Sequence, residues 1–383
     1  ILKTKNFILL LNLKPVNLPL TPVKLSFLTP ALTLTLFLLL AMCPESNSTG
    51  PECPCLLSFY NQSLHFTGNG MRYWYEEPNG FMSITNIPYN NLDCKTCHVK
   101  SCDRCHAMQD GSTMHFSQKK TKDMNTCLQC HPRAKLTFKY GNAADNLDVH
   151  IASGFVCADC HYQGDVHGDG RFKPSMRHPS PNGVSATCQG CHVDQKTESP
   201  EFDRDTPSHS AHGEKLHCSA CHVNSTMACY NCHFDSALKT GKKGNFIPMN
   251  DWLLLINYNE QVTSGSAMTL VYQNKKFIAY CPYFTHSIST QGRSCDQCHQ
   301  NKAVREMAKG NKITVVDFKD GKVVPWKGVV PVVPDKLQWV YLNKVGENKW
   351  VPVQDYKNAK VQFAAYGKPL TKEQFEKLAK DVK

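Results

Sequence analysis

The chain has 383 residues, enough for two or three ordinary domains, and its 41% hydrophobic and 20% charged residues are typical of a globular protein rather than a disordered one. A formal charge of +11 alone would favour an anionic partner, but the sequence has no basic helix or aromatic platform of the kind that binds nucleic acid. The outliers are 20 cysteines and 17 histidines, and the spacing of these residues has to decide their chemistry.

The N-terminal region, residues 1–43, contains an uncharged apolar stretch from Leu25 to Met42. This stretch is long for the core of a secretory signal and just long enough to span a bilayer. Three interpretations stay open: a secretory signal, which we favour, a retained membrane anchor, and a lipoprotein signal that ends at Cys43. Each of them exports the rest of the chain, whereas a buried core helix is disfavoured by Pro30.

Residues 44–93 are rich in aromatic side chains. The run Arg72–Tyr75, the turn residues Pro78-Asn79-Gly80 and the run Phe81–Ile84 follow the pattern of two strands joined by an Asn-Gly turn. The sequence therefore predicts a β-hairpin within an aromatic N-terminal β segment.

A five-residue pattern, Cys-x-x-Cys-His, occurs eight times between residues 94 and 299. Its cysteines are Cys94, Cys97, Cys102, Cys105, Cys127, Cys130, Cys157, Cys160, Cys188, Cys191, Cys218, Cys221, Cys229, Cys232, Cys295 and Cys298. Its histidines are His98, His106, His131, His161, His192, His222, His233 and His299. Chance would give roughly 0.05 such motifs at this composition. The pattern predicts eight c-type haems, because two thiols at this spacing reach the two vinyl groups of one haem and the next histidine ligates its iron.

Other uses of paired cysteines fit this pattern poorly. Zinc ribbons need no histidine after every second cysteine, a thioredoxin-like pair would occur once in a βαβ setting, and the spacing disfavours disulfides. Cysteines outside the motifs are Cys43, Cys53, Cys55 and Cys281. We interpret the first three as one disulfide or free thiols, with a sulfur-active cysteine near a haem as an alternative, and Cys281 as a packing residue.

Nine histidines lie outside the motifs, and eight are needed if every iron has a second histidine ligand. We expect these distal ligands to be His65, His115, His150, His167, His178, His209, His212 and His286. His217 is the expected spare, because attachment of the adjacent Cys218 pins it. Histidines on both sides close the axial positions of an iron and suit electron transfer, whereas catalysis needs an open position or an exchangeable ligand such as lysine.

The cofactors also change the meaning of the charge. Eight haems bring about 16 propionate charges and about +8 from ferric cores, so the holoprotein would carry about +3 when oxidised and about −5 when reduced. The basic residues therefore mostly offset propionates, and nucleic acid is not an expected partner.

The haem region, residues 94–300, has about 26 residues per haem, too few to build a protein core around each cofactor. We therefore predict a multihaem cytochrome c fold: mostly loops and short helices around a packed haem stack, with small β-hairpin elements and a C-terminal β/α tail. A β insert, residues 246–284, is expected to contain three short strands: Leu253–Tyr258, Met268–Tyr272 and Phe277–Tyr280.

The C-terminal segment, residues 301–383, contains neither cysteine nor histidine. Valine-rich strands are expected at Ile313–Phe318 and Val323–Val333. A final helix is expected to be capped by Thr371, with Gln374 completing a capping box. We interpret this segment as structural: a lid, a docking surface or a subunit contact.

An ordered series of short stretches lies within about residues 60–335. The stretches are His65–Gly68, Met71–Tyr75, Leu92–Cys94, Val149-His150, Cys157–His161, Asp165–Gly170, Cys218–His222, Cys229–His233, Tyr283–Ser287 and Trp326–Pro331. This series resembles the exported octahaem cytochromes related to octaheme tetrathionate reductase, in the wider group that contains hydroxylamine oxidoreductase. The resemblance implies export and eight c-type haems in close-packed pairs and, in the reductase, one haem with a distal lysine. No lysine of this chain takes that role by motif, nor can a tyrosine crosslink like that of hydroxylamine oxidoreductase be assigned.

The main hypothesis is a periplasmic, cell-surface or extracellular cytochrome that passes electrons along eight haem c groups to redox partner proteins or extracellular acceptors. The first alternative is an octahaem reductase of a small sulfur or nitrogen oxyanion such as tetrathionate, nitrite or hydroxylamine. The second is a subunit that assembles into oligomers or a conductive filament, in which a ninth histidine or the haem-free tail serves a neighbouring copy.

Overall fold

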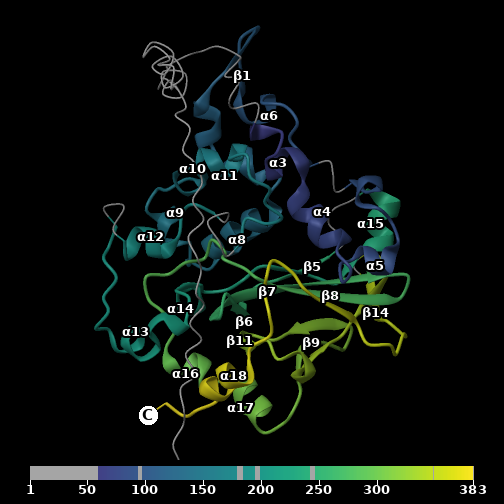
Figure 1. Ribbon diagram of the computed structural model, residues 1–383. Helices are drawn as coiled ribbons and strands as arrows, with labels where there is room; N and C mark the ends of the chain where they lie inside the picture. Colours follow the sequence, from purple (N-terminus) through teal and green to yellow (C-terminus); the bar gives the residue numbers. More distant parts are fainter. Residues whose placement is uncertain are drawn as a thin grey trace, which may run out of the picture. The chain divides into compact units, whose positions relative to one another are not determined.

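The computed structural model describes residues 59–93, 97–178, 184–194, 199–241, 246–347 and 349–382 (Figure 1). The expected signal or anchor lies outside these residues, as do Cys43, Cys53, Cys55 and Cys94. No helix in the described ranges is long and apolar enough to cross a membrane.

The aromatic segment before the motifs is helical, so the predicted β-hairpin is wrong where the structure describes it. It consists of α3 (Leu64–Thr67), α4 (Asn69–Glu76), α5 (Met82–Thr85) and the 3₁₀ turn η1 (Tyr89–Asn91). The Tyr75 hydroxyl donates to the Ile87 carbonyl at 2.8 Å, and a Cβ on Gly80 would lie 2.4 Å from the Trp74 carbonyl oxygen. Gly80 is therefore needed for close approach to the end of α4 and not for a hairpin turn.

Most of the motif region is built from short elements separated by loops. They are α6 (Asp103–His106), β1 (Ala107–Asp110), β2 (Thr113–Phe116), η3 (Gln118–Lys122), α7 (Met124–Leu128), α8 (Pro132–Ala143), α9 (Val149–Ala152), α10 (Cys157–Cys160), α11 (Gln163–His167), α12 (Cys188–His192), α13 (Pro207–His212), η4 (Gly213–Lys215) and α14 (Ser219–His222). In this region only β1 and β2 pair with each other, as a hairpin.

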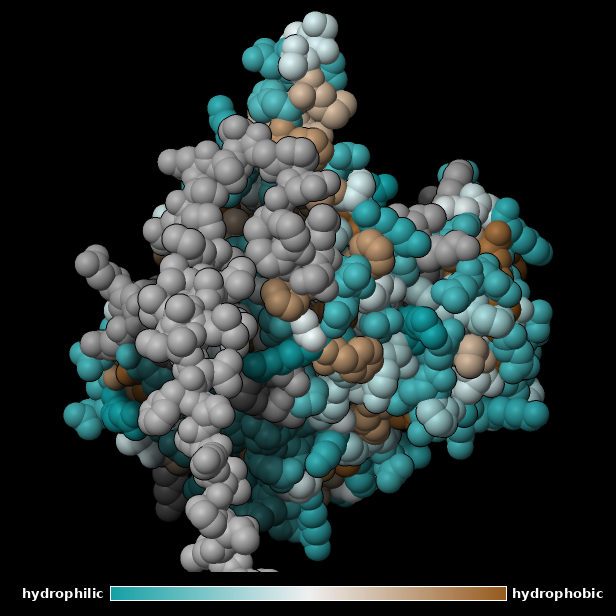
Figure 2. Space-filling view, turned by 45° about the horizontal axis from the view of Figure 1, so that its top comes forward, coloured by the Kyte–Doolittle hydropathy of each residue, from teal (hydrophilic) through white to brown (hydrophobic). Residues whose placement is uncertain are grey.

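This region lacks a protein core of its own. Between residues 100 and 219, none of the described hydrophobic side chains is buried. A chain segment of this length in an ordinary domain buries well over half of its surface. On the face drawn in Figure 2, the described surface likewise shows hydrophobic residues scattered among hydrophilic ones.

The β insert forms the centre of a six-stranded sheet. Its strands are β5 (Ile247–Met249), β6 (Trp252–Tyr258), β7 (Gln261–Tyr272) and β8 (Lys275–Pro282), so the three predicted strands are present and extend further than expected. The turn between β7 and β8 places Gln273 and Asn274 at positive φ. The antiparallel register pairs Leu254 with Gly265 and Met268 with Ala279.

The seventh motif and the C-terminal segment both contribute to this sheet. The order is β11-β6-β7-β8-β15, with β11 (Gly328–Pro331) and β15 (Lys360–Phe363) added in parallel at the two edges. Strand β3 (Ala228–Tyr230) pairs with β5, while β4 (Cys232–His233) pairs with β7 and leads into α15 (Phe234–Thr240). The predicted boundary near residue 300 is therefore not a structural boundary, because hydrogen bonds of one sheet cross it.

The rest of the C-terminal segment packs beneath the sheet. It follows α16 (Cys295–Cys298) of the eighth motif and contains α17 (Lys302–Ala308), β9 (Ile313–Lys319), β10 (Lys322–Pro325), η5 (Pro334–Lys336), β12 (Leu337–Trp339), β13 (Leu342–Gly346), β14 (Lys349–Pro352) and α18 (Lys372–Leu378). Val315, Val330 and Leu342 are fully buried with Trp252 and Ile256 in the largest hydrophobic cluster. In Figure 1, α17 and α18 lie on the opposite side of the sheet from helices α8–α12.

The predicted helix cap is confirmed. The Gln374 amide donates to the Thr371 side-chain oxygen at 3.1 Å, and the Thr371 amide donates to the Gln374 side-chain oxygen at 2.9 Å. This reciprocal pair is a capping box, which satisfies two amides at the start of α18.

The sheet should carry most of the chain's side-chain packing energy. Leu254 is fully buried and Leu238 is 42% exposed, so Leu254→Ala should lower the free energy of unfolding by about 2–5 kcal/mol and the matched Leu238→Ala by well under half of that. Denaturant unfolding followed by tryptophan fluorescence or circular dichroism measures both. Equal losses would contradict the assignment of the core to this sheet.

Candidate functional site

Most of the described motifs form one tight helical turn. The amide of the motif histidine donates to the carbonyl of the first cysteine at 2.8–3.1 Å in the motifs that end at His106, His131, His161, His222 and His299. Such a turn places both thiols and the imidazole on one side of the backbone. The seventh motif is different, because Cys229 and Cys232 lie in strands β3 and β4 on either side of Asn231, which has a φ of 52°.

Six of the eight motif histidines lie opposite a histidine from outside the motifs. The ring centroids are 6.0–6.2 Å apart in the pairs His65–His131, His106–His167, His150–His192, His161–His286, His209–His222 and His212–His299. Two imidazoles bonded to one metal at about 2 Å each have ring centres about 6 Å apart. Each pair therefore fits the distal and proximal ligands of one haem iron.

Many of these rings are fixed through Nδ1. His65 contacts the Val166 carbonyl at 3.0 Å, His192 that of Pro200 at 2.8 Å and His222 that of Ser289 at 3.0 Å. His209 and His212 make the same type of contact with Asp203 and Ser208, at 2.6 and 2.7 Å. An Nδ1–H that donates to a carbonyl leaves the Nε2 lone pair available to a metal.

His150 is held by a carboxylate instead. Its Nδ1 lies 3.1 Å from Asp148 Oδ1, and Asp148 Oδ2 accepts from the Ile288 amide at 2.8 Å. Burial opposes ionisation of Asp148, but the hydrogen bonds from His150 and Ile288 outweigh it and lower the pKa of Asp148. The same hydrogen bond raises the pKa of His150. Asp148 thus joins His150 to the segment that follows His286.

Neighbouring motifs along the chain are also neighbours in space. The thiol of Cys127 interacts with that of Cys157, and the thiol of Cys188 with that of Cys218; each interaction raises the pKa of the first thiol and lowers the pKa of the second. Burial raises the pKa of Cys298 to about 11, with the nearby Cys221 adding to the shift. The sixth and eighth motifs are therefore adjacent as well.

Two motif histidines have no described imidazole opposite them. The His98 ring stacks on Tyr89, whose hydroxyl is 3.2 Å from His98 Nε2, and a Cβ on Gly68 would lie 1.7 Å from the same nitrogen. In His233, Nδ1 lies 2.9 Å from the Ser236 hydroxyl and accepts from the Ser236 amide at 3.3 Å. These two positions differ from the six pairs.

Three histidines outside the motifs are not among the six pairs. His115 is exposed on β2, His178 packs edge-on against Tyr366 at 4.8 Å, and His217 packs on Phe284 at 4.9 Å. Nδ1 of His217 accepts from the Ser219 amide at 3.2 Å, and burial lowers the pKa of His217 to about 4.

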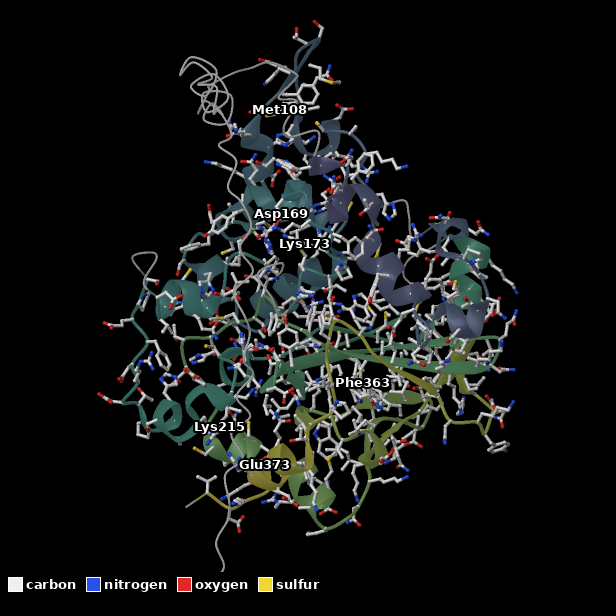
Figure 3. All side chains as sticks on the ribbon, viewed as in Figure 1. Met108, Asp169, Lys173, Lys215, Phe363 and Glu373 are labelled. Atoms are coloured by element: carbon white, nitrogen blue, oxygen red, sulfur yellow. The ribbon has the colours of Figure 1, made fainter. Side chains whose placement is uncertain are left out.

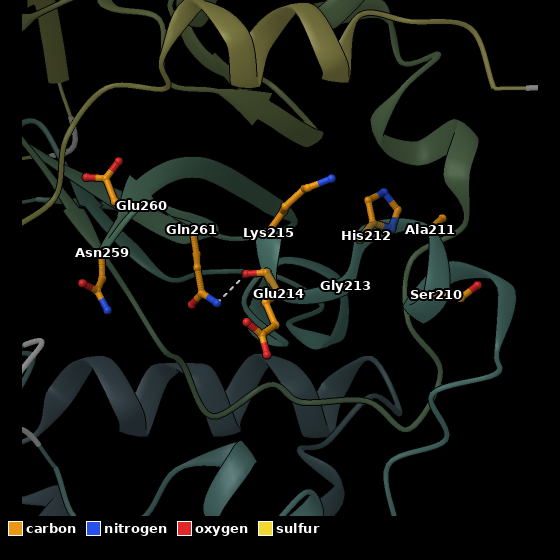
Figure 4. Close-up of a pocket in the computed structure, with 9 residues that line it drawn as sticks. All are labelled: Ser210, Ala211, His212, Gly213, Glu214, Lys215, Asn259, Glu260 and Gln261. Carbon is orange, nitrogen blue, oxygen red and sulfur yellow. Dashed lines mark hydrogen bonds between the residues drawn. The ribbon is translucent and has the colours of Figure 1, made fainter. Parts of the chain in front are cut away.

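A cavity of about 620 Å³ lies beside one of the pairs (Figure 4). It is lined by Ser210–Lys215, which include His212 opposite His299, and by Asn259–Gln261. Its volume is within the range of about 300–1,000 Å³ that is usual for cofactor and ligand sites. Within the described ranges, no group of three or more His, Cys, Asp or Glu side chains is placed to hold a bare metal ion.

Comparisons of the chain with protein-family models, with curated proteins and with solved structures found no match.

The pairing predicts which histidines control the state of an iron. His150→Ala or His286→Ala should open one axial position and produce a high-spin signal, because each ring faces a motif histidine. His217→Ala is the matched control and should leave the spectrum unchanged, because its ring faces Phe284. Electron paramagnetic resonance and visible absorption of the oxidised protein measure the effect. A high-spin signal in His217→Ala alone would contradict the pairing.

Proposed function

We propose that the chain is an exported octahaem c-type cytochrome that conducts electrons between redox partners. The observation that carries the proposal is the set of six imidazole pairs at 6.0–6.2 Å, each of which combines a motif histidine with a histidine from a different element of the chain. When bound, haem supplies an iron that alternates between the ferric and ferrous states. The paired imidazoles would hold both axial positions, which keeps each iron closed to substrates and suited to electron transfer.

The arrangement of the motifs supports a continuous path. Thiol contacts link the third motif to the fourth and the fifth to the sixth. Weaker electrostatic contacts link Cys105 with Cys130, Cys160 with Cys191 and Cys221 with Cys295. Cofactors attached at these cysteines would follow one another from the second motif to the sixth and on to the eighth. Electrons could then pass between neighbouring haems over short distances.

A reductase is the second candidate, and the surroundings of His98 favour it. The Tyr89 hydroxyl lies 3.2 Å from His98 Nε2, and no described imidazole occupies the opposite side. An iron bound there could have an exchangeable ligand, which reduction of a small sulfur or nitrogen oxyanion requires. Tyr89, which is 2% exposed, could then donate a proton or a hydrogen bond to that ligand.

Covalent attachment can be tested by mass. The denatured protein should keep its haem colour and weigh roughly 4.9 kDa more than the polypeptide, because each of eight motifs holds one haem. Removal of Cys102 and Cys105 together should lower the mass by one haem, whereas Cys281→Ala, outside the motifs, should leave it unchanged. Intact-mass spectrometry of protein made with a cytochrome c attachment system measures this. Seven or fewer haems in the fully loaded protein would contradict the count.

Turnover of small substrates separates the two candidate functions. For a conductor, we expect the reduced protein to bind at most two equivalents of carbon monoxide, at the His98 and His233 irons. We also expect tetrathionate, nitrite and hydroxylamine to reoxidise it without saturation. For a reductase, one of these substrates should give saturable turnover, which Tyr89→Phe should lower. Stopped-flow absorbance measures reoxidation, and the His217→Ala variant serves as the control.

A further inference from the structure

Two arginines converge on one buried tyrosine. Cζ of Arg133 lies 4.8 Å from the ring centroid of Tyr283, and Cζ of Arg177 lies 5.3 Å from the same centroid. Arg133 and Tyr283 are also close enough for their side chains to interact electrostatically. Tyr283 is 9% exposed, and both arginines are partly buried.

No described carboxylate neutralises these two cations. Neither Arg133 nor Arg177 forms an ion pair with any residue that the structure describes. The buried Lys173 is different, because its ammonium pairs with Asp169 at 3.3 Å (Figure 3). Two guanidiniums facing one ring repel each other, and shielded cations without a counter-charge are costly.

Tyr283 cannot supply the missing charge. Burial raises the pKa of Tyr283, and this effect outweighs the two arginines, which act to lower it. The phenol is therefore neutral near pH 7. Its ring offers cation–π attraction, which is worth about 0.5–2 kcal/mol and does not cancel a net charge of two.

The two arginines are held in place rather than trailing into solvent. Arg133 stands in the first turn of the twelve-residue helix α8, two residues after His131, where the helix N-terminus adds positive potential. The carbonyl of Arg177 accepts from the Tyr258 hydroxyl, and its amide donates to the Ser175 hydroxyl at 3.1 Å. Cys229 of the seventh motif lies within electrostatic range of Arg133. The cluster therefore lies where the third and seventh motifs approach each other.

We propose that Arg133 and Arg177 together bind an oxyanion beside Tyr283. Guanidinium forks match the paired oxygens of such a group and tolerate burial better than ammonium groups do. The oxyanion is either a haem propionate or a free small oxyanion, since both present the same oxygens. This inference rests on the proposed function, because it needs haems at the neighbouring motifs.

The test is a redox titration of the haem-loaded protein followed by visible absorbance. Arg133→Gln and Arg177→Gln each remove one cation, which disfavours the electron gained on reduction, so one titration step should move to lower potential while the others stay in place. Arg133→Lys should keep most of the potential because it keeps the charge. Arg305→Gln is the matched control, since Arg305 is exposed on α17 and far from this cluster in the fold.

Sulfate, compared with chloride at equal ionic strength, distinguishes the two sources of the oxyanion. A wild-type titration that is insensitive to sulfate, together with the shift in the Gln variants, identifies a propionate. A wild-type step that moves with sulfate concentration, and stops moving in the Gln variants, identifies a free oxyanion.

Titrations of both Gln variants that superimpose on wild type and on Arg305→Gln, with no effect of sulfate, would overturn the site. If either Gln variant fails to fold, the other one still removes one cation from the cluster and provides the same comparison. Intact mass separates this failure from a failure of the proposed function: eight haems without any shift would reject the oxyanion site alone, whereas a chain without haem would reject the cytochrome itself.

Discussion

The gap between facing imidazoles is the constraint on which the motif region depends. Six ring pairs keep almost the same separation although they join different elements, and in each pair the two histidines come from separate parts of the chain. Hydrogen bonds from Nδ1 to backbone carbonyls hold several of these rings without using Nε2. The described residues between 100 and 219 bury no hydrophobic side chain, so the paired and hydrogen-bonded imidazoles, rather than a protein core, are what recur through this region.

The sheet provides the buried hydrophobic core that the described residues between 100 and 219 do not form. Its strands bury Trp252, Leu254 and Ile256 almost completely, and the C-terminal segment closes it at both edges. The two parts are joined by specific contacts: Asp148 fixes both His150 and the Ile288 amide, and Arg293 donates to the carbonyls of Val223 and Asn224. The loop between β8 and α16 therefore contacts the segments next to His150 and His222.

The sequence was informative wherever the signal is local. The Thr371 cap and the strands of the insert depend on residues a few positions apart, and the structure contains each of them. The prediction of a hairpin around Gly80 was wrong because this glycine is needed for close approach to the backbone of α4, not for a turn between strands. Three features depend on long-range contacts that leave no pattern in the sequence. They are the pairing of histidines with motifs, the addition of C-terminal strands to the sheet, and the convergence of Arg133 and Arg177 on Tyr283.

The seventh motif bears on the order in which the protein can be assembled. Strand β4 is hydrogen-bonded to β7 at Leu270 and Val271. Asn231, which lies between the two cysteines of the motif, and His233, which follows the second cysteine, are buried. Cys102 and Cys295, by contrast, are exposed. In the proposed cytochrome, an attachment enzyme would reach the exposed cysteines after folding more easily than the half-buried Cys229 and Cys232, whose neighbours the sheet covers. Maturation would therefore depend on the relative rates of thioether formation at the seventh motif and of β-sheet formation. If the sheet formed first, the folded protein would lack a single haem, at that motif.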